Sequence, residues 1–120
     1  MTTNPPQPKR GEIWQIDLDP TVGVEIQKVR PVVVVSSDAA GRLPIKLIAP
    51  ITGWDVRYSQ NFWHVKIIPN AKNGLSKDSA VDLLQARGVD TSRFIKKLGR
   101  LEAGVMENIA AAMAALVEYA

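Results

Sequence analysis

The chain contains no cysteine and only one histidine, His64, among its 120 residues. The lack of cysteine excludes disulfide scaffolds, thiolate zinc sites and cysteine nucleophiles, and a reducing cytosol tolerates it easily. A single histidine excludes an acid/base pair of two histidines within one chain and a histidine-rich metal site. Any chemistry must therefore come from other groups, and we expect neither a metal nor a cofactor.

Long hydrophobic runs are also missing, since no stretch approaches the roughly 20 apolar residues needed to span a bilayer. Residues 1–8 hold three prolines and no apolar run, which predicts a flexible arm and neither a signal peptide nor a membrane anchor. The remaining residues, 9–120, are enough for one domain with one core, because 46% of the chain is hydrophobic. We expect a soluble, cytoplasmic, single-domain protein.

The chain has little excess of either charge, with 15 basic against 12 acidic residues and a net charge of +3. Basic residues are spread over both halves of the chain, so no charged tail exists and folding must assemble any basic site. This balance permits an anionic partner without requiring one.

The hydrophobic pattern predicts an antiparallel α+β fold. Residues 14–18 alternate apolar and polar side chains, and residues 30–35 are so rich in valine that we expect a strand buried on both faces. Further strands are expected over residues 45–51, 64–68 and 80–86. Because no helix separates these strands, the sheet should be an antiparallel barrel or sandwich.

Near the C-terminus, apolar residues recur every three or four positions, which predicts an amphipathic helix over residues 103–118. This helix would close the open side of the barrel or form an oligomer interface. A shorter helical turn is expected near Asp90, where three good N-cap residues follow one another.

The segment from Gly23 to Pro31 is the first candidate site. It presents Glu25, Gln27 and Arg30 before a rigid strand, and the guanidinium fork of Arg30 fits two phosphate oxygens. An alternative is a plain hairpin with a surface salt bridge from Glu25 to a nearby cation.

Two further candidates follow along the chain. Thr52 ends an apolar strand and can donate a hydrogen bond to phosphate, although a Thr-Gly pair also suits an ordinary turn. Residues 54–63 hold four of the seven aromatic residues, beside Arg57. Such a cluster, which begins at Trp54, can stack on unpaired bases, and it equally suits a barrel cap or a dimer interface.

Gln85 and Arg87 are the last candidate pair. If residues 80–86 continue as a strand, they share one face, where Gln85 can read a base edge and Arg87 a phosphate; alternatively both are solvent-side residues. The basic residues that follow suggest a solvated face. His64 suits a satisfied strand-edge residue better than a catalyst.

These motifs, in this order, resemble the MazF/PemK family of toxin–antitoxin endoribonucleases across residues 9–119. The matching elements are residues 10–14 (Arg-Gly-Glu-Ile-Trp), Asp-Pro at 19–20, Arg-Pro at 30–31, Ile-Thr at 51–52, and Leu-Gln-Ala-Arg at 84–87. The resemblance implies an SH3-like barrel with a C-terminal helix.

The same resemblance implies a function: metal-independent cleavage of single-stranded messenger RNA at a short sequence, which inhibits translation until a cognate acidic antitoxin neutralises the toxin. The essential arginine and threonine of the family fall on Arg30 and Thr52. Glu25, Gln85 and Arg87 fall on positions that bind substrate or support the site. Some members use a loop histidine, but Val24 occupies that position here.

Cleavage of this kind uses the 2′-OH of the RNA and leaves a 2′,3′-cyclic phosphate and a 5′-OH. Arg30 can supply charge and Thr52 can orient phosphate. An arginine of ordinary pKa is a poor base, so Glu25 is a chemically better one if it reaches the hydroxyl. The sequence leaves the identity of the base open.

The main alternative is a non-catalytic toxin or binding module on the same barrel, of the kind that poisons DNA gyrase. Those poisons resemble one another at a C-terminal Trp-Gly-Ile, whereas this chain ends in Val-Glu-Tyr-Ala. The apolar helix face and the aromatic cluster also predict a homodimer.

Overall fold

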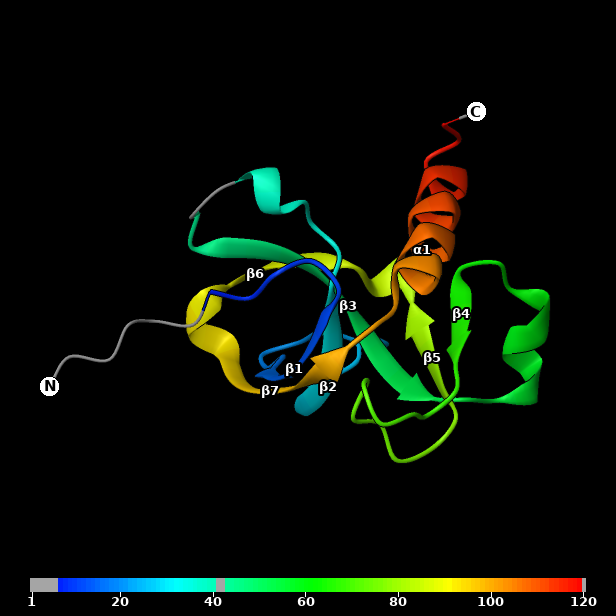
Figure 1. Cartoon of the computed structure of the whole chain (residues 1–120), viewed down its shortest axis with the longest axis horizontal. Coiled ribbons are helices and arrows are strands. Elements are labelled where there is room, and N and C mark those ends of the chain that lie inside the picture. Colours follow the sequence, from blue (N-terminus) through cyan, green and yellow to red (C-terminus); the bar gives the residue numbers. More distant parts are fainter. Residues whose placement is uncertain (1–6, 41–42, 120) are drawn as a thin grey trace, which may run out of the picture.

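The computed structural model describes residues 7–40 and 43–119, which form a curved antiparallel sheet with one α-helix against it (Figure 1). Six strands follow the order β4-β5-β3-β2-β1-β7, and β6 pairs with β3 beside this path. The strands are β1 (Glu12–Asp17), β2 (Val29–Val34), β3 (Ile45–Gly53), β4 (His64–Ile67), β5 (Ser79–Asp82), β6 (Arg87–Asp90) and β7 (Phe94–Arg100). The expected barrel-like α+β fold is confirmed, with β4 and β7 as the two ends of an unclosed sheet.

The expected N-terminal arm lies outside the described residues except for Gln7 and Pro8. Pro8 is fully buried. Pro8, which was expected to belong to the flexible arm, is therefore part of the packed body of the protein.

β3 joins the two parts of the sheet. It pairs with β6 as far as Ile48 and with β5 from Ile51 onward, while its middle residues pair with β2. Pro50 lies where the partner changes, and proline suits such a point because it has no N–H to donate. The strand thereby carries its C-terminal end, with Thr52, from one part of the sheet to the other.

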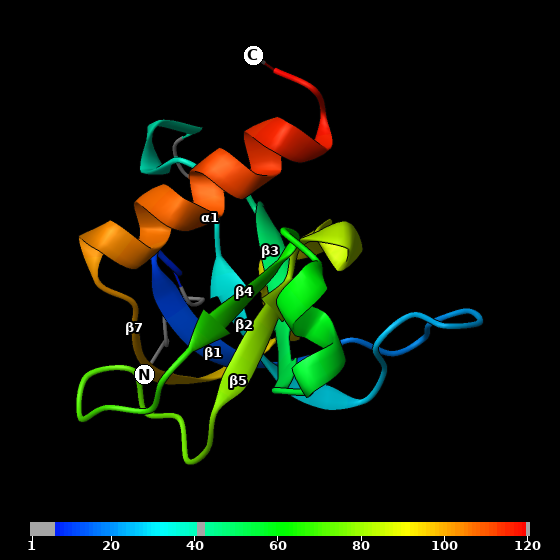
Figure 2. The same cartoon turned by 90° about the vertical axis from the view of Figure 1, so that its right-hand side faces the viewer.

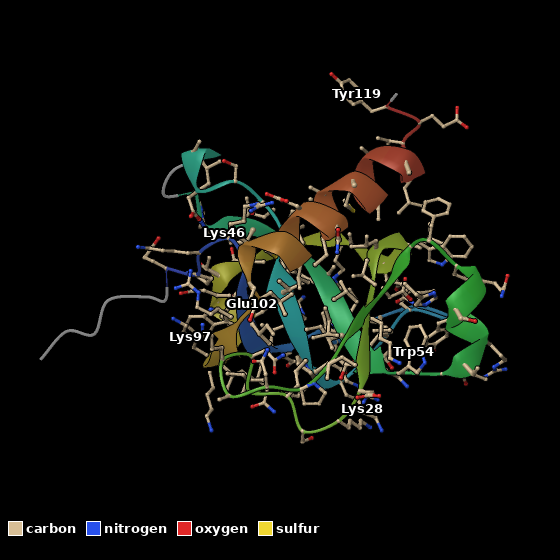
Figure 3. All side chains as sticks on the ribbon, turned by 45° about the vertical axis from the view of Figure 1, so that its right-hand side comes forward. Lys28, Lys46, Trp54, Lys97, Glu102 and Tyr119 are labelled. Carbon is tan, nitrogen blue, oxygen red and sulfur yellow. The ribbon has the colours of Figure 1, made fainter. Side chains whose placement is uncertain are left out.

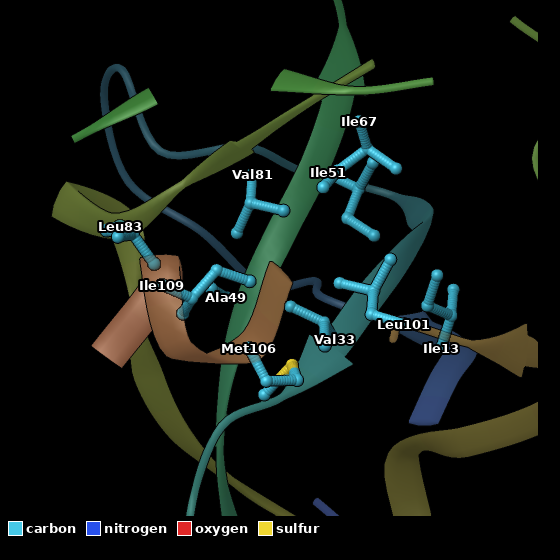
Figure 4. Packing of buried hydrophobic residues seen from close by; sticks show 10 residues of the cluster. All are labelled: Ile13, Val33, Ala49, Ile51, Ile67, Val81, Leu83, Leu101, Met106 and Ile109. Atoms are coloured by element: carbon cyan, nitrogen blue, oxygen red, sulfur yellow. The ribbon is translucent and has the colours of Figure 1, made fainter. Parts of the chain in front are cut away.

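Buried side chains form two hydrophobic clusters on opposite sides of β2. Val33 belongs to the first cluster, which lies between the sheet and the helix (Figure 4). Val32 and Val34 belong to the second cluster, together with Ile16 and Ile48. All three valines are completely buried, so the expectation of a strand buried on both faces is confirmed.

The helix α1 (Ala103–Leu116) covers the first cluster with Met106 and Ile109. Its register matches the expected apolar stripe, although the helix ends two residues before the expected Glu118. In the described part of the chain, no helix combines the length and the hydrophobicity needed to cross a membrane.

The prediction of a strand over residues 80–86 is wrong beyond Asp82, where β5 ends. The Asp82 side chain accepts a hydrogen bond from the Leu84 backbone N–H at 3.1 Å, which caps a 3-10 turn, η3 (Leu83–Gln85). A local side-chain bond of this kind competes with the sheet ladder and ends the strand. Gln85 therefore lies on a turn and Arg87 begins β6, so the two do not share a strand face.

The expected helical turn after Asp90 is confirmed as η4 (Thr91–Arg93). The basic segment that follows is exposed, as expected, but it forms the seventh strand, β7, which the sequence did not predict. β7 pairs with β1 through two register shifts, so its apolar and polar residues do not alternate cleanly.

The turn before β5 supports the outer edge of β7. Gly74 has a φ of +70°, and a Cβ atom there would lie 2.2 Å from the carbonyl oxygen of Leu98. We expect Gly74→Ala to lower the free energy of unfolding by at least about 2 kcal/mol in urea denaturation, because strain and collision act together.

The matched control is Gly104→Ala in α1, where an added Cβ would meet nothing within 4 Å. It should be neutral or stabilising by up to about 1 kcal/mol, since alanine favours helix. Equal stabilities for the two variants would contradict this role of Gly74.

Candidate functional site

The loop between β1 and β2 projects from the body of the molecule (Figure 2) and covers a cavity of about 390 Å³. Four polar side chains contribute to the lining of this cavity: Glu25, Asp82, Gln85 and Arg87. Apolar and aromatic residues, including Ile26 and Trp63, complete the walls. A largely apolar cavity with a few convergent polar groups is typical of a ligand site.

Gln85 holds the loop in place. Its Oε1 accepts a hydrogen bond from the Ile26 backbone N–H at 2.6 Å, and its Nε2 donates to the Val24 carbonyl at 3.3 Å. The side-chain amide is thus bonded to the backbone on both sides of Glu25. In this structure Gln85 therefore supports the loop, and its role in reading a base stays a prediction.

Two arginines hold the end of β1 in a similar way. Arg87 donates from Nη2 to the Leu18 carbonyl at 2.9 Å, and Arg93 donates to the carbonyls of Asp17 and Asp19. Because an arginine bond to a carbonyl is charge-assisted, these contacts fix the base of the loop. Arg87, expected as a phosphate ligand, therefore has a structural contact within the cavity wall.

Glu25 lies in the loop itself. Its Oε1 accepts from the Val22 backbone N–H at 2.5 Å, within the turn that contains Gly23 at a φ of +62°. Within residues 7–40 and 43–119, no ion pair joins Glu25 to Lys28 or Arg30, so the salt-bridged hairpin is not what forms. Glu25 is instead one of the residues that line the cavity.

Arg30 is the second residue of β2 and is exposed, with its Nε donating to the Gln27 carbonyl at 3.3 Å. Gln27 thus contributes through its backbone. Val32 pairs with Pro50, and extending this antiparallel register by two residues sets Arg30 opposite Thr52. Both side chains belong to the face that carries the second hydrophobic cluster, and Pro50 on that face lines the cavity.

Thr52 is half-buried and pairs with Ala80 of β5. Its neighbour Gly53 was expected to leave the backbone open, but the Lys77 side chain lies across it, with Nζ 3.3 Å from the position of an added Cβ. Neither Arg30 nor Thr52 lines the cavity itself, but the extended register sets a guanidinium and a hydroxyl opposite each other, two residues from Pro50 of the lining. Such a pair can bind and polarise a phosphate group.

Trp54 and Arg57 lie outside the cavity lining. Arg57 is exposed and forms a forked contact with Asp55, with Nε to Oδ1 at 3.0 Å and Nη2 to Oδ2 at 2.8 Å. Hydrogen bonding from the Arg57 side chain lowers the pKa of Asp55 to about 2. Trp54 packs beside the turn η2 (Val56–Gln60), edge-on to Tyr58 (Figure 3). Their role in RNA binding stays a prediction.

One residue of the cavity, Asp82, was not among the candidates, whereas Trp63 belongs to the aromatic cluster of residues 54–63 that was expected to stack on bases or to pack. Trp63 and Asp82 both line the cavity, and Asp82 faces His64, with Nε2 to Oδ2 at 3.5 Å. The sequence contained a signal for the His64–Asp82 pairing, because the Asn73-Gly74 turn lies midway between these two residues. Pairing β4 with β5 about that turn sets His64 opposite Asp82.

The charges of the site are divided. Cationic Arg30 lies at the exposed start of β2, whereas carboxylates of Glu25 and Asp82 line the cavity with Arg87. Among the described residues, no three histidine, aspartate or glutamate side chains gather closely enough to hold a metal ion. The arrangement offers phosphate contacts at its edge and hydrogen-bond acceptors inside.

Solved structures define the class of this fold. MazF from Deinococcus radiodurans superposes with a TM-score of 0.77 at 24% identity, covering 92% of this chain and 96% of that one. An endoribonuclease in complex with its cognate antitoxin, from mycobacterial species, superposes with a TM-score of 0.74 at 16% identity, covering 95% and 98%. The protein therefore has the fold of the MazF toxins.

Sequence comparison is more specific. The family model described as PemK-like, MazF-like toxin of type II toxin-antitoxin system matches residues 9–117. Endoribonuclease EndoA of Bacillus subtilis is 35% identical over 103 residues, covering 84% of this chain and 86% of the relative. Endoribonuclease MazF9 of Mycobacterium tuberculosis is 31% identical over 107 residues, covering 84% and 88%. The chain belongs to the PemK-like, MazF-like toxin family.

The contacts of Gln85 predict how the loop responds to its removal. In Gln85→Ala, the Ile26 amide should exchange with deuterium roughly 10-fold faster, because a lost hydrogen bond is worth about 1 to 1.5 kcal/mol. Gln60→Ala, at the exposed end of η2, is the control and should leave the exchange unchanged. Unaltered exchange at Ile26 in Gln85→Ala would show that the amide does not hold the loop.

Proposed function

We propose that this protein is a sequence-specific, metal-independent endoribonuclease toxin that cuts single-stranded messenger RNA. The observation that supports the proposal is the register of β2 and β3, because its extension by two residues from Val32 and Pro50 pairs Arg30 with Thr52 next to the lining of a loop-covered cavity. Family membership supports it, since two curated relatives are named endoribonucleases. An enzyme of this kind inhibits translation by destroying messages.

The proposed reaction is an internal transesterification. The 2′-oxygen forms a bond to phosphorus, the bond from phosphorus to the 5′-oxygen breaks, and the products are a 2′,3′-cyclic phosphate and a 5′-OH. One proton leaves the 2′-OH and one reaches the departing 5′-oxygen. Arg30 stabilises the charge that develops on the phosphoryl oxygens, and the Thr52 hydroxyl donates a hydrogen bond to one of them.

Glu25 is the loop residue best suited to accept the proton of the 2′-OH. A carboxylate accepts a proton far more readily than a guanidinium, whose ordinary pKa is about 12.5 or higher. The Glu25 side chain also lines the cavity, and its Oε1 contact with Val22 fixes its orientation in the loop. Arg30 would then stabilise the developing charge, and Glu25 would accept the proton.

Removing either group at the edge should slow cleavage. We expect Arg30→Ala to lower kcat about 100- to 1000-fold, the usual cost of losing one donor to a developing oxyanion. Thr52→Ala should lower kcat by a smaller factor, because a neutral hydroxyl stabilises charge less than a guanidinium. Initial rates on a fluorogenic RNA oligonucleotide measure both effects.

The control for these variants is Arg100→Ala. Arg100 is also an exposed arginine, but it pairs with Glu12 at the start of β1, whereas Arg30 pairs with Ile16 near the end of β1. Arg100→Ala should retain wild-type kcat, and all three variants should keep the wild-type circular dichroism spectrum. Near wild-type cleavage by folded Arg30→Ala protein would exclude the assigned role of this residue.

Replacing the nucleotide 5′ to the cut by its 2′-deoxy form tests the chemistry itself. Without a 2′-OH the internal nucleophile is gone, so cleavage at that bond should stop while binding persists. Mass spectrometry of the products from the all-RNA control should show the cyclic phosphate. Continued cutting of the 2′-deoxy substrate would require an external nucleophile such as water.

We further propose a cytoplasmic homodimer that an acidic antitoxin neutralises. Exposed apolar side chains surround the cavity mouth, among them Val24 and Leu84, and they offer surface for a partner chain. An extended acidic segment laid across Arg30 would mimic the charge of RNA. Solved neighbours include MazE-MazF complexes, which supports an antitoxin partner.

A further inference from the structure

Asp82 differs from the other polar groups of the cavity. Glu25, Gln85 and Arg87 are each bonded to the backbone of the loop or its base. Asp82 lines the cavity from the end of β5 and keeps 11% of its side chain exposed although the residue as a whole is buried. Its carboxylate is therefore an acceptor in the cavity lining that does not hold the loop.

The Asp82 carboxylate retains hydrogen-bonding capacity. Its Oδ1 accepts from the Leu84 N–H, and its Oδ2 lies 3.5 Å from His64 Nε2. A carboxylate offers about four lone-pair sites, so each oxygen can accept a further bond.

His64 fixes the direction of this carboxylate. The Asn61 amide nitrogen lies 3.2 Å from His64 Nδ1, and the other ring nitrogen, Nε2, faces Asp82. Tyr58 stacks on the imidazole with centroids 3.9 Å apart and an interplanar angle of 4°. Only 8% of the His64 side chain is exposed, which makes it a positioning residue for Asp82.

Trp63 supplies a flat surface beside the same carboxylate. It lines the cavity, packs against the first hydrophobic cluster and contacts Phe62 edge-on at 5.3 Å. A half-buried indole supported from behind is a stacking platform for a planar ligand.

We propose that this cavity is the subsite for one unpaired nucleobase that carries an exocyclic amino group, stacked on Trp63 and read by Asp82. The proposal rests on the proposed function, because it assigns part of the RNA specificity to this chain. Adenine, cytosine and guanine can each donate an amino N–H to a carboxylate. Uracil has no amino group, and its two carbonyl oxygens flank the single ring N–H and repel the carboxylate.

The negative charge of Asp82 favours a base over a phosphate as the group that enters the cavity. Asp82 would repel a phosphate, whereas Arg30 at the cavity edge attracts one. A nucleotide with its phosphate near Arg30 and its base inside the cavity therefore satisfies both groups.

Asp82→Asn is the informative variant, because it keeps an oxygen to accept from the Leu84 N–H and replaces the other acceptor by a donor. Rates are measured on oligonucleotides with each of the four bases at every position of the recognised sequence. Wild-type protein should reject uracil at one position by about 5- to 150-fold, and Asp82→Asn should lose or reverse that preference. Other positions should keep their profile.

Asp78→Asn is the matched control, since this carboxylate is exposed and faces Lys66 at 4.0 Å. It should leave the preference at every position unchanged. A folded Asp82→Asn protein that cuts RNA with the wild-type base preference would overturn the proposal.

A binding experiment separates this inference from the proposed function. The four nucleoside 5′-monophosphates are titrated into full-length protein while the indole N–H signal of Trp63, assigned with Trp63→Phe, is followed by NMR. Shifts with the three amino-bearing nucleotides and weaker shifts with uridine monophosphate support the subsite even if no RNA is cut. Equal shifts for all four nucleotides, or none, would overturn it.

Discussion

Burial of β2 on both faces is the constraint on which the site depends. Val33 packs under the helix while Val32 and Val34 pack on the opposite side, so the strand cannot slip by one residue without exchanging its two faces. The same register sets Arg30 opposite Thr52. A guanidinium and a hydroxyl that approach one phosphate must keep their separation to a fraction of an ångström, and two hydrophobic clusters provide that rigidity. The packing that stabilises the core therefore also fixes the position of Arg30 relative to β3.

Several of the polar groups near the site serve the scaffold. Gln85 and Arg87 hold the loop and its base, and Arg57 is paired with Asp55. Arg30, in contrast, is exposed at the start of its strand. A net charge of only +3 is consistent with this division, because short RNA segments require few phosphates to be neutralised. In the proposed function, recognition of RNA would depend on the shape and hydrogen bonding of the cavity more than on long-range attraction.

Local patterns predicted the fold well where one face or both faces of an element were buried. The valine strand and the C-terminal helix are in this group, because burial imposes their periodicity. The prediction failed after Asp82, where a single side-chain hydrogen bond turned the chain, and at β7, whose bulges break the alternation. Arg30 and Thr52 were candidates from the residues and from the resemblance, and their role stays a prediction, although the extended register sets them opposite each other. The pairing of Asp82 with His64 could have been predicted only by combining two expected strands with the Asn73-Gly74 turn between them, because neither strand pattern shows it alone.

The central claim is that the assembled site cuts RNA and does not merely bind it. The most direct measurement incubates purified protein with a long defined transcript in the presence of a chelator and maps the new 5′ ends by sequencing. We expect discrete ends that carry 5′-OH groups and recur at one short sequence. A transcript that is bound and protected but remains intact would contradict it.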